Sequence, residues 1–130
     1  MAERPLSPHL SVYRMHRYTL LTSMLNRITG LALAAGLILL VYWLMAAAAG
    51  PGAYAQAESV LALWIFKAVF LVLLAVFSYH LCAGVRHLVW DTGRGLERAQ
   101  SRVSAYVVLG ASAVLFVGLA CWWLVSRVLA

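Results

Sequence analysis

Two histidines in the second half of the chain are the residues whose type and position could support chemistry. His80 lies inside a long apolar run, and His87 follows seven residues later, directly after Arg86. At ~1.5 Å per residue, His80 lies about 9 Å inside the boundary that Arg86 marks. An ionisable residue at that depth in hydrocarbon is a candidate functional residue, and the alternative is a neutral histidine hydrogen-bonded to a neighbouring helix.

The neighbours of His80 indicate which metal chemistry it could support. Gly84 lies one turn further along the same helical face, where the missing side chain suits either a flat macrocycle or close helix packing. Residues 59–85 contain no carboxylate. Cys82, like Cys121, matches no ligand motif, and we interpret both as small buried hydrophobic residues. Zinc and di-iron sites therefore lack ligands, and a histidine on its own is the pattern of haem ligation.

A six-coordinate haem needs a second ligand on its opposite face. His87 shares the face of His80 but lies ~10.5 Å along the helix axis. Two imidazoles on one iron need nitrogens only about 4 Å apart. His9 and His16 precede the apolar spans. If His80 binds haem, the second ligand must therefore come from another chain. Arg86 and His87 could pair with haem propionates or with phospholipid, although either taken singly fits a positively charged flank.

Membrane-spanning helices must position these residues. Of the 130 residues, 65% are hydrophobic and 11% charged, whereas soluble domains have about 25% charged residues. Residues 31–49, 59–85 and 103–126 are each apolar enough to supply the ~20 residues that ~30 Å of hydrocarbon requires. Spans in lipid must satisfy their own backbone groups, so we expect helices. We predict an all-α integral membrane protein, a single membrane-anchor domain over residues 1–130 with a leader at 1–21 and three transmembrane helices at about 22–49, 59–90 and 103–128.

The arginines predict how the helices are oriented. The two arginine-rich segments are the leader with the start of the first helix and the second connection, which carry Arg4, Arg14, Arg17, Arg27, Arg86, Arg94, Arg98 and Arg102. The first connection carries Glu58 and no Lys or Arg. The positive-inside rule then predicts a cytoplasmic N-terminus and an outside C-terminus. The net charge of +6 also predicts a basic cytoplasmic face for a soluble partner, and nothing else favours nucleic acid.

Three stretches resemble one family. Residues 80–91, HLCAGVRHLVWD, resemble the H-x-x-x-G-x-R-H-L-x-x-D motif of the cytochrome b membrane-anchor subunit of succinate dehydrogenase (respiratory complex II). Residues 4–13, RPLSPHLSVY, resemble the leader of that family, and residues 23–30, SMLNRITG, resemble its S-x-x-H-R-x-T-G motif. The resemblance covers nearly the whole chain, because the three matches occur in order along it.

The resemblance implies a non-catalytic anchor with no activity alone and no catalytic residue of its own. With a second small membrane subunit, the anchor would hold an iron–sulfur protein and a flavoprotein. Succinate would be oxidised at the flavin, and electrons would pass through iron–sulfur clusters to a quinone. His80 falls on the position of the axial ligand to haem b, whose other histidine belongs to the second anchor subunit. Ser23 and Arg27 fall on quinone-site positions.

One residue departs from the family pattern. Asn26 stands where the family has a histidine near the haem propionates, and an asparagine can donate a hydrogen bond but cannot carry charge. We therefore treat the following residues as candidates for haem-propionate or interface contacts: Asn26, Arg86, His87 and Asp91. For Ser23 and Arg27, the alternatives to quinone binding are a helix cap and a topology flank.

The predicted location is a bacterial inner membrane, in contact with lipid, because no Arg- and Ser-rich transit peptide precedes the leader. A mature organellar chain would look the same. We also consider two other functions. The equivalent subunit of a fumarate reductase differs in the direction of the net reaction. A haemless structural or transport protein would use His80 as a packed polar residue.

Overall fold

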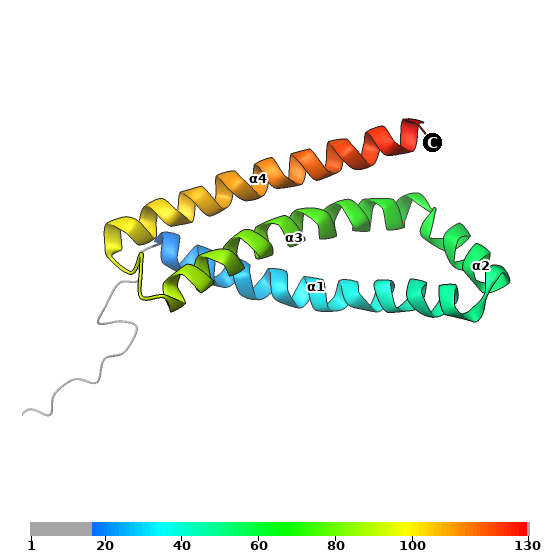
Figure 1. Ribbon diagram of the computed structural model, residues 1–130, viewed down its shortest axis with the longest axis horizontal. Coiled ribbons are helices and arrows are strands. Elements are labelled where there is room, and N and C mark those ends of the chain that lie inside the picture. Colours follow the sequence, from blue (N-terminus) through cyan, green and yellow to red (C-terminus); the bar gives the residue numbers. More distant parts are fainter. Residues whose placement is uncertain (1–16, 130) are drawn as a thin grey trace, which may run out of the picture.

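The computed structural model describes residues 17–129, which form four α-helices and no strand in that range: α1 (Arg17–Ala49), α2 (Pro51–Leu61), α3 (Trp64–Asp91) and α4 (Arg98–Leu129) (Figure 1). Three segments are long and apolar enough to cross a membrane: Leu20–Ala49, Trp64–Asp91 and Arg98–Ser126. These segments confirm the prediction of an all-α membrane protein with three spans. Residues 1–16 of the predicted leader lie outside the described residues, and the remainder, 17–21, belongs to α1.

The first connection contains a helix that the sequence did not predict. Gly50 ends α1 with φ of 110°, a conformation that favours glycine, and Pro51 occupies the start of α2. Between Pro51 and Leu61 the chain is rich in alanine, which has the highest helix propensity. Leu63, with ψ of 144°, then interrupts the helical path before α3. The second span therefore begins at residue 64, whereas we expected it to begin near residue 59.

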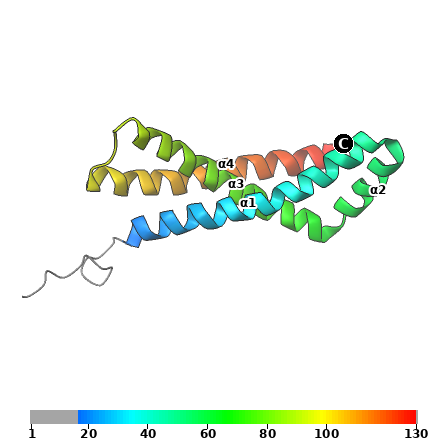
Figure 2. The same cartoon turned by 90° about the horizontal axis from the view of Figure 1, so that it is seen from below.

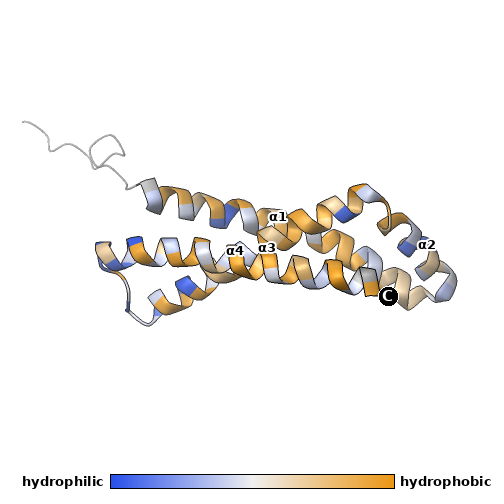
Figure 3. Cartoon of the chain, turned by 90° about the horizontal axis from the view of Figure 1, so that it is seen from above, coloured by the Kyte–Doolittle hydropathy of each residue, from blue (hydrophilic) through white to orange (hydrophobic). Residues whose placement is uncertain are grey.

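The long helices pack with α3 in the middle. It lies against α4 over most of its length and also against α1, while α2 lies beside the far end of α1 (Figures 1 and 2). The start of α1 and the α3–α4 turn share one end of the molecule, and α2 and the C-terminus share the other. Hydrophilic residues gather near the α3–α4 turn and on α2, whereas the long helices are largely hydrophobic (Figure 3). The arginines of the α3–α4 turn thus lie at the same end as the start of α1.

The interior of this bundle is small. Its core cluster consists of Tyr79, Ala83 and Val108, against which Cys82 packs. Ser78 is completely buried, and its hydroxyl donates to the Leu74 carbonyl at 2.8 Å. Small side chains allow helices in lipid to approach closely, where packing takes the place of a hydrophobic driving force.

Most large apolar side chains of the described helices point outward. Leu31 is 75% exposed and Val114 is also 75% exposed. Cys121 is exposed on α4, so our expectation of burial was wrong for this cysteine, whereas Cys82 is partly buried as part of the α3–α4 contact. A surface of this composition requires lipid or other helices around it.

Candidate functional site

His80 on α3 lies against a short segment of α1. Its Nδ1 is 3.1 Å from the Thr29 Oγ1. A Cβ atom placed on Gly30 would lie only 3.2 Å from the His80 Cε1, which is tighter than nine in ten real Cβ contacts. The missing side chain at Gly30 therefore allows the imidazole to lie against α1, and the Thr29 hydroxyl binds one of its ring nitrogens.

The other side of this imidazole is available to a ligand. Within the part of the chain that the structure describes, Nε2 of His80 has no hydrogen-bond partner, and the side chain is only partly buried. One turn along α3, a Cβ placed on Gly84 would meet no atom within 4 Å. A ring held at one nitrogen and free at the other, beside open space, fits an axial ligand to haem iron.

Residues 17–129 contain no group of three His, Cys, Asp or Glu side chains that could hold a metal ion.

Arg86 is buried at the contact between α3 and α4. Its Nε donates to the Ser104 Oγ at 2.9 Å, and its Nη2 donates to the Ser101 carbonyl at 2.9 Å and to the Ser101 Oγ at 3.2 Å. The guanidinium also lies over the Trp90 ring, with Cζ 4.1 Å from the ring centroid. Trp90 Nε1 in turn donates to the Gly95 carbonyl at 3.1 Å. This arginine therefore joins α3, α4 and the turn between them.

The sequence did not identify the two serines that receive these hydrogen bonds. Ser101 and Ser104 are three residues apart, and residues three apart share a helix face, which was the available signal. It could not show that this face meets Arg86, because the pairing depends on the α3–α4 turn.

A second contact between α1 and α3 lies closer to the start of α1 than the contact of His80 with Thr29. Asn26 Nδ2 is 3.3 Å from His87 Nε2, and an amide NH₂ can only donate, so the ring nitrogen accepts. The imidazole of His87 also packs edge-to-face on Trp90, with centroids 5.2 Å apart. The Asn26 Oδ1 is buried and has no hydrogen-bond partner among residues 17–129. A buried acceptor without a partner costs ~1–3 kcal/mol, so this atom is a natural place for a donor from outside the chain.

Ser23 and Arg27 are exposed on α1, and neither side chain makes a hydrogen bond to the residues that the structure describes. Since α1 begins at Arg17, Ser23 lies within the second helical turn. The alternative reading of Ser23 as a helix cap is therefore wrong. Asp91 is the exposed last residue of α3.

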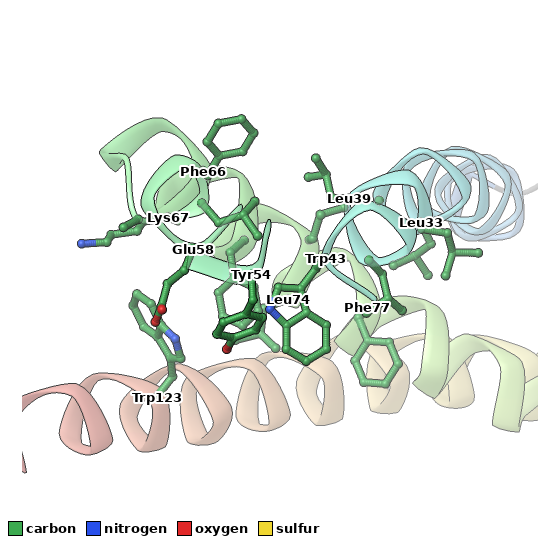
Figure 4. A pocket seen from close by; sticks show the side chains of 17 residues that line it. Leu33, Leu39, Trp43, Tyr54, Glu58, Phe66, Lys67, Leu74, Phe77 and Trp123 are labelled. Atoms are coloured by element: carbon green, nitrogen blue, oxygen red, sulfur yellow. The ribbon is translucent and has the colours of Figure 1, made fainter. Parts of the chain in front are cut away.

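A cavity of about 930 Å³ opens at the other end of the bundle (Figure 4). Leucine and phenylalanine side chains form most of its wall, and Trp43 contacts Tyr54 there with ring centroids 6.2 Å apart. Glu58 and Lys67 also line it. None of the predicted site residues contributes to this cavity, and no sequence pattern indicated it.

Comparison with known proteins identifies relatives over most of the chain. The family described as succinate dehydrogenase/fumarate reductase transmembrane subunit matches residues 1–119. The succinate dehydrogenase cytochrome b556 subunit of Paracoccus denitrificans is 45% identical over 114 residues, which cover 88% of this chain and 87% of that protein. The cytochrome b560 subunit of Reclinomonas americana is 37% identical, covering 82% and 77% of the two chains. The mitochondrial cytochrome b560 subunit of Sus scrofa is also 37% identical, covering 92% and 71%.

Proposed function

Because this chain belongs to the family of succinate dehydrogenase cytochrome b membrane subunits, we propose that it binds haem b through Nε2 of His80, with a second anchor subunit supplying the other axial ligand. The observation that carries this proposal is the environment of the His80 ring, which contacts Thr29 through Nδ1 and has no hydrogen-bond partner at Nε2 among the residues that the structure describes. When bound, haem b supplies a one-electron redox centre within the membrane. The names of the relatives, cytochrome b556 and b560 subunits, agree with this cofactor.

The proposed quinone site uses Ser23 and Arg27. The two residues are four apart on α1, so their side chains leave the same face, and both are exposed without side-chain hydrogen bonds to residues 17–129. A quinone carries two carbonyl acceptors on an apolar ring. A hydroxyl and a guanidinium supply donors to those carbonyls, and the fixed positive charge favours the negative charge that develops on quinone oxygen during reduction.

The second part of the proposal concerns partners. A second small membrane subunit would cover part of the exposed apolar surface of α1, α3 and α4, and lipid would cover the rest. An iron–sulfur subunit and a flavoprotein would dock at the end where α1 begins and the α3–α4 turn lies. The arginines at this end support a cytoplasmic N-terminus under the positive-inside rule. The bacterial relatives support the inner membrane as the location.

Gentle detergent purification of the tagged chain from its native membrane tests this function. We expect a second small membrane protein, an iron–sulfur protein and a flavoprotein to co-purify, with a b-type band in the reduced-minus-oxidised spectrum. A chain that purifies with neither haem nor these proteins would contradict the proposal.

A further inference from the structure

The side chain of Thr29 has a specific relation to the proposed haem ligand. We propose that Thr29 is a positioning residue, which fixes the tautomer and the orientation of His80 so that the lone pair of Nε2 is presented to iron. This inference rests on the proposed ligation by His80 and adds the residue that prepares the ligand.

The hydrogen bonds around the hydroxyl of Thr29 determine where its proton lies. Oγ1 is 2.7 Å from the Leu25 carbonyl and 3.0 Å from the Asn26 carbonyl, in addition to the 3.1 Å contact with His80 Nδ1. A hydroxyl has one proton, and carbonyl oxygens can only accept. If the proton pointed at His80, the hydroxyl oxygen would face two carbonyl oxygens with lone pairs alone. The proton therefore points toward the carbonyls of α1.

The direction of the His80 contact follows from this assignment. With its proton donated to α1, Oγ1 can only accept from His80, so Nδ1 carries the ring proton. A neutral imidazole has one protonated nitrogen, and Nε2 is then the unprotonated one. That is the form an axial ligand requires. Histidine ligands commonly donate their other N–H to an oxygen, which orients the ring and strengthens it as a donor.

The surroundings make this hydrogen bond effective. Thr29 is only 8% exposed, so water competes little for either partner. Gly30 permits the ring to lie against α1, because a Cβ atom at this position would approach Cε1 to 3.2 Å. The hydroxyl and the glycine thus act on the same ring, one by hydrogen bonding and the other by leaving space.

Substitutions that differ only in the hydroxyl test the proposal in the assembled complex. Thr29→Val keeps the shape of threonine and removes the oxygen. Thr29→Ser and Thr29→Ala form a second pair, both smaller than threonine and different from one another by one oxygen. Ser112→Ala is the matched control, because Ser112 is also buried and its hydroxyl donates to a carbonyl of its own helix, Leu109, at 2.9 Å.

The measurements are a redox titration of the haem and its low-temperature EPR spectrum. Loss of the acceptor weakens His80 as a donor to ferric iron, so we expect the midpoint potential to shift upward and the low-spin signal to change in Thr29→Val and Thr29→Ala. Thr29→Ser and Ser112→Ala should keep the original potential and signal.

Four outcomes separate this inference from the proposed function. A change in midpoint potential and EPR signal that is confined to the variants without the hydroxyl, Thr29→Val and Thr29→Ala, supports the role of Thr29. Unchanged potential and EPR signal in Thr29→Val and Thr29→Ala overturn it, provided that His80→Ala still removes the low-spin haem. Failure of both variants to assemble while Thr29→Ser assembles would assign Thr29 a folding role and also overturn it. A haem spectrum that survives His80→Ala instead refutes the ligation itself.

Discussion

At the scale of single residues, substitutions can distinguish the proposed role of His80 from that of His87. Replacing His80 by alanine removes the nitrogen proposed to bind iron, so we expect the low-spin b-type spectrum to be lost or converted to another spin state. His87→Ala removes a contact with Asn26 and should leave six-coordination intact. Optical and EPR spectra of the two purified variants check this expectation. The opposite pattern would show that the ligand was assigned to the wrong histidine.

The quinone assignment is tested at Arg27 and Ser23. We expect Arg27→Leu to lower succinate-to-quinone activity by roughly 10- to 100-fold, since a hydrogen bond from a charged donor is worth ~1.5–3 kcal/mol. Ser23→Ala removes a neutral donor and should lower the activity by roughly 2- to 10-fold. Both rates are compared with succinate oxidation by an artificial dye that accepts electrons upstream of the quinone.

The dye measurement also controls for assembly. Both variants must retain the flavoprotein and the iron–sulfur protein at the membrane. If quinone reduction and dye reduction decreased in equal proportion, Ser23 and Arg27 would serve docking or topology, and the quinone assignment would have to be abandoned.

At the scale of helices, Arg86 joins α3 to α4. Arg86→Lys keeps the positive charge at this end, but a single ammonium group lacks the planar fork that reaches both serines and stacks on Trp90. We expect the free energy of unfolding to decrease by about 1.5–3 kcal/mol, because a buried hydrogen bond to a charged group is lost. The measurement is the Tm of the detergent-solubilised complex.

Arg94→Lys is the matched control, since Arg94 is exposed in the α3–α4 turn. It should leave the Tm unchanged. An Arg86→Lys complex with the original Tm but an altered haem spectrum would instead indicate that Arg86 serves the haem propionates, the other role considered for it.

At the scale of the whole molecule, we expect that the chain cannot complete a bis-histidine haem site by itself. Nε2 of His80 has no hydrogen-bond partner among the described residues. The bundle has three candidate spans, and the described helices carry most of their large apolar side chains on the outside. Expressed alone, the chain should lack a bis-histidine spectrum unless two copies associate and each supplies His80. Light scattering of the detergent-solubilised chain, combined with EPR, checks both points. A demonstrated monomer with a bis-histidine haem would contradict this prediction.

The sequence by itself determined the number of spans and the depth of His80. Both depend on distances along one helix, where rise per residue and apolar length give the answer. The arginine-rich segments and the motif at residues 80–91 could also be identified from the sequence alone. The helix at Pro51–Leu61 was missed, because the Gly50-Pro51-Gly52 run indicated a break and did not show that an alanine-rich segment would resume helically after it.

Only the tertiary structure decided which residues meet across helices. Thr29 and Gly30 belong to a motif that the sequence showed, yet their contact with His80 spans about fifty residues of chain. The pairs Asn26–His87 and Arg86–Ser104 were likewise not predictable. Periodicity defines the faces of each helix, but the rotation and crossing of two helices follow from packing of small residues along both of them. That packing is a property of the pair of helices, and it brings Nδ1 of His80 within hydrogen-bond distance of the Thr29 hydroxyl.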